Sequence, residues 1–314
     1  MKNIDVIIMV SESHLHMLKR ILPYCKNNVN PKRIYVIANQ NIKKQIIEIP
    51  DIEFVDENTV YNGLNYNSVQ AIIEDITGQK KRAGWYLQQF LKMAWSFKCE
   101  DTSYISVDAD TFLLNPIEFF DNSGKYLITP KIEYHKPYFD CIDRLFEGRI
   151  HKVGDFSFIA ENMIFDSGIM KNMILEIENN SNLKGEKFYE KILYAVNPGD
   201  ILFSGFSEFE TYGTFIFTNY PERVKLRPLR TMREALVLLG SNPSEAQLKW
   251  ASEDYDIISI EASHYKKTLT TWLTSKSLFR KKVSMKKLAK MRYRIRRLYR
   301  RILKKEDFYI EQYN

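Results

Sequence analysis

Short apolar runs alternate with amphipathic stretches in the first part of the chain. Ile4–Val10 and Arg33–Ala38 are rich in β-branched residues and predict buried strands, and Ile52–Val55 predicts a possible third strand. The stretch from about His14 to Cys25 predicts a helix between the first two strands. A strand, a helix and a strand at this spacing indicate a βαβ unit, so the fold class expected is α/β with a parallel sheet.

The same pattern continues beyond residue 80. A helix is predicted from about Ala83 to Lys98, with Leu87, Phe90, Leu91, Ala94 and Trp95 as its core stripe. A buried strand follows at 104–107, and 126–129 and 158–165 are further candidate strands. Asp166 is expected to cap a helix that runs to about Glu178.

Two carboxylates follow the predicted strand at 104–107. Asp108 and Asp110 lie where that strand should end, in the segment Val-Asp-Ala-Asp-Thr-Phe-Leu-Leu-Asn-Pro. Carboxylates are costly to bury without a partner, and oxygen ligands suit a hard divalent cation. The segment is therefore either a metal site or an ordinary acidic turn.

Other polar residues are expected near the same edge of the sheet. Ser11 to His14 follow the first strand, and ligands of open parallel sheets bind beyond the carboxyl ends of the strands. Gln88 and Lys92 are four residues apart and share one helix face, which suits either a phosphate or sugar contact or a solvated surface.

Charge is distributed unevenly along the chain. The 314 residues carry a net charge of +7, yet 276–305 holds fifteen Lys or Arg and no Asp or Glu. The remaining 31 basic residues are outnumbered by 39 acidic residues, which leaves that part at −8. This asymmetry predicts a domain over 1–275 and a basic tail over 276–314. The three cysteines suggest no disulfide framework, the N-terminus does not fit a signal peptide, and no apolar run is long enough to span a membrane.

The helix segment Gly-Trp-Tyr-Leu-Gln-Gln-Phe-Leu-Lys and the Asp-Ala-Asp segment together resemble GT-A-type glycosyltransferases, and among these the bacterial enzymes that build capsule and lipopolysaccharide. The resemblance covers roughly residues 1–270. It implies a Rossmann-like, mixed, mostly parallel sheet and a nucleotide-sugar donor bound through Mn²⁺ or Mg²⁺. Asp110 would be a metal ligand in this DXD motif, and Asp108 would contact ribose or a metal-bound water. His264 would be a further metal ligand. Lys266, Lys267 or Lys92 would add a second positive contact.

An inverting transfer needs a base that deprotonates the acceptor hydroxyl. Ser207-x-x-Glu210 fits a capping box, so Glu210 is expected to cap a helix and Glu208 to serve as the base. Either of the two carboxylates remains a candidate, and a retaining mechanism would need no separate base. Glu161 and Asn162 interrupt an apolar strand and are second candidates for sugar contacts.

The tail pattern predicts a basic amphipathic helix. Its apolar stripe is Met285, Leu288, Met291, Ile295, Leu298 and Ile302. Such a helix suits an anionic membrane surface, so we expect a cytoplasmic protein that is peripheral on the inner membrane face and uses a saccharide or lipid-linked acceptor. The alternatives are docking of the stripe on the body and a nucleic-acid-binding protein that acts through its tail. A phosphoesterase is less favoured, because only five histidines are present and they are scattered.

Overall fold

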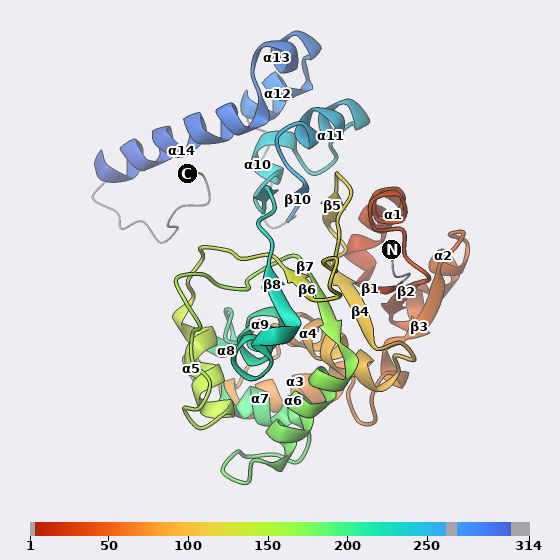
Figure 1. Cartoon of the computed structure of the whole chain (residues 1–314), viewed down its shortest axis with the longest axis vertical. Helices are drawn as coiled ribbons and strands as arrows, with labels where there is room; N and C mark the ends of the chain where they lie inside the picture. Colours follow the sequence, from red (N-terminus) through yellow and green to blue (C-terminus); the bar gives the residue numbers. More distant parts are fainter. Residues whose placement is uncertain (1–3, 262–268, 303–314) are drawn as a thin grey trace. The chain divides into compact units, whose positions relative to one another are not determined.

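The computed structural model describes residues 4–261 and 269–302 (Figure 1). The chain forms two compact units. Unit 1 contains residues 1–15, 31–108 and 119–227, and unit 2 contains 16–30, 109–118 and 228–314. The division of the chain near residue 275 that the charge pattern suggests stays a prediction.

A five-stranded sheet with the order β3-β2-β1-β4-β7 organises unit 1 (Figure 1). Its strands are β1 (Asp5–Val10), β2 (Ile34–Ala38), β3 (Glu53–Asp56), β4 (Ser103–Val107) and β7 (Asn162–Asp166). The first four are parallel, and β7 pairs with β4 antiparallel. The predicted α/β class with a mixed, mostly parallel sheet is therefore confirmed. The central strands are buried on both faces, which explains their continuous apolar sequences.

Helices flank this sheet. Those of unit 1 are α2 (Lys43–Ile47), α3 (Tyr66–Thr77), α4 (Ala83–Ala94), α5 (Lys136–Leu145), α6 (Ser167–Asn179), α7 (Phe188–Ala195), α8 (Pro198–Ile201) and α9 (Glu208–Asn219). Helix α4 packs on β1, and α6 packs on β4 and β7. The predicted cap of α6 is confirmed, because Asp166 Oδ1 accepts a hydrogen bond from the Ile169 amide at 2.9 Å.

Two strand predictions need correction. The strand expected over 158–165 begins only at Asn162, because residues 158–161 lie outside the ladder with β4. The strand expected over 126–129 is β6 (Tyr126–Ile128), which is not part of the main sheet. It pairs in parallel with β8 (Val224–Leu226) in a separate two-stranded sheet. Pairing of this kind joins segments almost a hundred residues apart, and local sequence patterns do not encode it.

Unit 2 contains a small sheet with the order β5-β10-β9. Its strands are β5 (Thr111–Leu113), β9 (Thr231–Met232) and β10 (Ile257–Ser259). Its helices are α1 (Leu15–Val29, all but the first residue), α10 (Leu236–Leu239), α11 (Glu245–Ser252), α12 (Leu269–Ser275), α13 (Ser277–Lys282) and α14 (Met285–Ile302). The predicted helix after β1 is thus present, and it connects the parallel pair β1 and β2.

The described part of the basic tail contains the predicted amphipathic helix, α14, whose first turn packs in the core of unit 2. Met285 and Leu288 are buried, and the Trp250 indole donates to the Val283 carbonyl at 3.0 Å. Farther along α14, Met291, Ile295 and Leu298 are exposed. None of the helices in the described residues combines the length and the hydrophobicity needed to cross a bilayer.

Candidate active site

The carboxyl end of β4 gathers polar side chains from distant segments of unit 1. Asp108 follows β4 directly, and its amide donates to the Glu161 carbonyl at 3.0 Å. Because β7 is antiparallel, its first residue, Asn162, lies opposite Val107 at the same edge. The pairing of β4 with β7 therefore brings Asp108 beside Glu161 and Asn162, which are more than fifty residues farther along the sequence.

Lys92 joins two carboxylates at this edge. Its Nζ lies 2.6 Å from Asp108 Oδ1 and 2.7 Å from Glu208 Oε1. The side chain comes from the last turn of α4, which is tied to β4 because the Tyr104 hydroxyl donates to the Lys92 carbonyl at 2.7 Å. Burial lowers the pKa of Lys92, but the carboxylates of Asp108 and Glu208 together raise it by more than burial lowers it, so the net shift is upward. Lys92 is therefore a buried, fully charged cation.

Glu208 begins α9 and is only 3% exposed. Burial raises the pKa of Glu208, the nearby Lys92 ammonium lowers it, and the negative charge of Asp108 raises it again, with an upward net shift. Its amide donates to Gln89 Oε1 at 3.2 Å, which fixes the start of α9 against α4. Glu208 is therefore a buried carboxylate that is held beside a fixed cation.

Glu210 has a different role from the one that the capping-box pattern suggests. Ser207 does cap α9, since its Oγ accepts from the Glu210 amide at 3.2 Å. The Glu210 carboxylate, however, accepts from the Phe158 amide at 2.7 Å and from the Thr214 hydroxyl at 3.2 Å, and it makes no reciprocal bond to Ser207. Burial raises the pKa of Glu210 to about 7. The expectation that Glu210 completes a capping box is therefore wrong.

A second buried ion pair lies next to Asp108. Lys131 Nζ donates to Glu161 Oε2 at 3.0 Å, and both side chains are buried. Among the described residues, the other oxygen, Glu161 Oε1, is buried and has no hydrogen-bond partner. A buried carboxylate oxygen is costly to leave unsatisfied, so this atom marks a position where a ligand hydroxyl would be favourable.

The remaining predicted residues have different surroundings. Ser11 follows β1, and its hydroxyl lies 2.8 Å from His14 Nδ1. Gln88 is half-buried on α4, whereas the neighbouring Gln89 is buried and contacts Glu208. Gln88 stays a candidate for a donor contact, and Lys92 is buried and does not lie on a solvated face.

The proposed metal ligands are divided between parts of the chain. Asp108 belongs to unit 1 and Asp110 to unit 2, where the Asp110 carbonyl accepts from the Ile260 amide at 3.0 Å. His264 and Lys266 lie outside the described residues. Within the described ranges, no three His, Cys, Asp or Glu side chains gather as a metal site. The Asp108 carboxylate itself suits a hard cation, because its side chain is 34% exposed and Lys92 contacts only Oδ1.

Sequence reasoning missed Gln89 and Lys131. Gln89 lies beside Gln88 in the same motif but opposite the apolar stripe on a helical wheel, and it is buried because α4 is enclosed on nearly all sides. No pattern in the sequence indicated Lys131. It lies near Glu161 only because its backbone pairs with that of Ser157 in an isolated bridge.

The structure is similar to solved structures of glycosyltransferases. Mouse xyloside xylosyltransferase 1 in its apo form shares 11% identity over 84% of this chain and 99% of that chain, with a TM-score of 0.42. The apo bifunctional glycosyltransferase WbbM shares 11% identity over 84% of this chain and 46% of that chain, with a TM-score of 0.46. The galactosyltransferase LgtC, in complex with donor and acceptor sugar analogs, shares 9% identity over 89% and 96%, with a TM-score of 0.43.

No family model and no curated protein matches the chain. The solved structures are distant likenesses, with TM-scores below 0.5. The function is therefore argued from the site itself.

Proposed function

We propose that this chain is a glycosyltransferase that moves a sugar from a nucleotide-sugar donor to a saccharide or lipid-linked acceptor with inversion. The contact of Lys92 with both Asp108 and Glu208 supports the proposal, because it brings two carboxylates from distant segments together around one cation. The site lies at the carboxyl edge of a mostly parallel sheet, where ligands of such sheets bind.

The residues of the site have separate roles in this proposal. Glu208 takes the proton of the acceptor hydroxyl as that oxygen attacks the anomeric carbon. Lys92 stays charged and holds the carboxylates of Asp108 and Glu208 in place, so the base is oriented before substrate arrives. The unpartnered Glu161 oxygen, with Asn162 beside it, accepts from hydroxyls of the transferred sugar. Ser11 and Gln88 remain candidates for donor contacts.

A divalent cation, Mn²⁺ or Mg²⁺, would be held by Asp108 and Asp110 with His264 as a further ligand, and would neutralise charge on the diphosphate leaving group. Lys266 would add a second positive contact to the diphosphate. Asp108 fits this role chemically, since its carboxylate is partly exposed and contacts Lys92 through one oxygen.

The decisive experiment is a thermal-shift screen of nucleotide sugars with and without Mn²⁺. The matching donor should raise Tm only when the cation is present, and Asp110→Ala should abolish the rise. Glu208→Gln should keep the donor-dependent shift and lose sugar transfer by about a hundredfold or more. Equal shifts in the wild type and Asp110→Ala would refute the metal role, and an active Glu208→Gln would move the base elsewhere.

The proposal extends to a membrane-bound acceptor. On the basic helix α14, Met291, Ile295 and Leu298 are 49%, 62% and 61% exposed, and Lys or Arg residues surround them. An apolar stripe within a basic face favours an anionic bilayer over water. We therefore place the enzyme on the cytoplasmic face of the membrane, where surface polysaccharides such as capsule or lipopolysaccharide would be extended.

Vesicle binding tests the membrane proposal. Deleting the tail from residue 276 would remove Met285 and Leu288 from the core of unit 2, so point substitutions are the better probe. Ile295→Ser with Leu298→Ser should weaken binding to phosphatidylglycerol-containing vesicles by about tenfold. Ile47→Ser, an exposed site in unit 1, is the control. Binding that is unchanged in the double variant would contradict the proposal, and loss of salt-sensitive RNA binding instead would favour the nucleic-acid alternative.

A further inference from the structure

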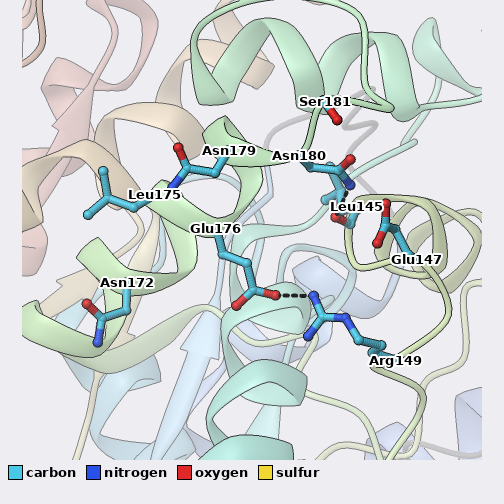
Figure 2. A pocket seen from close by; sticks show the side chains of 9 residues that line it. All are labelled: Leu145, Glu147, Arg149, Asn172, Leu175, Glu176, Asn179, Asn180 and Ser181. Carbon is cyan, nitrogen blue, oxygen red and sulfur yellow. Dashed lines mark hydrogen bonds and ion pairs between the residues drawn. The ribbon is translucent and has the colours of Figure 1, made fainter.

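A pocket of about 590 Å³ lies in unit 1, and none of its residues belongs to the candidate active site. Figure 2 shows the side chains that line it. They are Leu145, Glu147, Arg149, Asn172, Leu175, Glu176, Asn179, Asn180 and Ser181. A volume of this size is within the range of small-molecule sites.

One wall is the solvent-facing side of α6. Asn172, Glu176 and Asn179 recur at intervals of four and three residues, which places them on one face of the helix. Asn172 and Asn179 are both exposed to solvent, so their amide groups are accessible to a ligand. Each amide offers both a donor and an acceptor.

The opposite wall is the turn that follows α5, and bonds fix it against α6. Arg149 and Glu176 form an ion pair of 2.5 Å, which joins the two walls (Figure 2). Asn180 donates to the Leu145 carbonyl at 3.2 Å, and Asn182 donates to Glu147 Oε1 at 2.6 Å. The pocket is therefore held in shape by the protein's own contacts.

The turn at the pocket is a helix C-cap. Glu147 follows the end of α5 in the left-handed region, with a φ of 53°. The Gly148 amide donates to the Asp143 carbonyl at 2.8 Å, which is the bond expected when a left-handed residue ends a helix. This cap fixes the course of the turn beside the pocket.

The chemistry of the lining selects the ligand. Two carboxylates and one guanidinium give the pocket a net negative charge, which disfavours phosphates and other anions. Two exposed amides and the Ser181 hydroxyl match a ligand rich in hydroxyl groups. Leu175, which is 46% exposed, offers apolar contact to the C–H face of a sugar ring. We infer that this pocket binds a neutral saccharide, separately from the donor and from the site of transfer.

Saturation-transfer difference NMR and calorimetry on the full chain test the inference. Maltotetraose and cellotetraose are the neutral probes, and a heparin tetrasaccharide is the anionic one. At least one neutral probe should bind below about 10 mM. Asn172→Ala with Asn179→Ala should weaken that binding by about tenfold, because two hydrogen-bonding groups are lost. Both positions are exposed, so the variant should fold normally, and Asn67→Ala on the exposed face of α3 is the matched control.

The active-site variant Glu208→Gln should bind the neutral probe as the wild type does. This arm separates the inference from the proposed function, because no donor, metal or transfer is involved. The absence of binding by both neutral probes, equal binding by the double variant, or loss of binding in Glu208→Gln would each overturn the inference. Preference for the heparin fragment would overturn it as well.

Discussion

The carboxyl group of Glu210 should make the stability of unit 1 depend on pH. It is 1% exposed in the first turn of α9, and it accepts hydrogen bonds from the Phe158 amide and the Thr214 hydroxyl. Burial raises its pKa from 4.5 to about 7, because these two donors and the more distant Lys152 do not compensate fully for lost hydration. Between pH 4.5 and about 7, the folded protein therefore holds a proton on Glu210 that the unfolded chain has already released.

The sign and size of the effect follow from this difference. Because the folded-state pKa is raised, the stabilisation is complete below pH 4.5 and is lost as the pH rises through about 7. Ionising the buried group costs about 3 kcal/mol of unfolding free energy by pH 8. Glu210→Gln keeps the shape of the side chain and removes the titration.

Urea unfolding at pH 5 and pH 8 measures the effect. Trp250→Phe and Trp272→Phe leave Trp85 and Trp95, both in unit 1, as the fluorescent reporters. The difference in unfolding free energy between Glu210→Gln and its parent should shift by about 2.5 kcal/mol in favour of the variant from pH 5 to pH 8, because pH 5 already lies above the unfolded pKa. The same difference at both pH values would refute the reasoning, since any loss of a hydrogen bond by the glutamine is common to both.

Two further substitutions test the packing of the site. Lys92→Met should lower the unfolding free energy by about 3 to 5 kcal/mol in urea unfolding, because it leaves the buried Glu208 beside a second carboxylate without a cation. The loss should be smaller when Glu208→Gln is added, and equal losses would contradict the pairing. Gly213→Ala should lower the unfolding free energy by about 1 to 3 kcal/mol, because its Cβ would lie 2.3 Å from the Phe158 ring. Gly199→Ala has open space and should change thermal stability little, so similar effects at the two glycines would refute this packing.

Local patterns predicted elements whose residues face one environment along their whole length. The strands β1, β2 and β4 are continuous apolar runs because helices or neighbouring layers cover both sides of the sheet. The cap at Asp166 was predictable because a side-chain oxygen three residues before an amide is a local arrangement. Asp108 was predictable as a candidate for a similar reason, because it directly follows the apolar run of β4 and a carboxylate is unfavourable inside a buried strand.

Long-range pairing decided the rest of the site. Whether Lys92 is solvated or buried depends on two carboxylates, one 16 and the other 116 residues away in the chain. The Glu161 pair with Lys131 depends on an isolated bridge between Lys131 and Ser157, which both lie outside the strands. The sequence by itself therefore determined the α/β class, the acidic end of β4 and the basic helical tail, because spacing along the chain encodes each of them. Only the tertiary structure decided which charges neutralise one another, because the partners of a buried ion are chosen by the folding of distant segments onto one edge of a sheet.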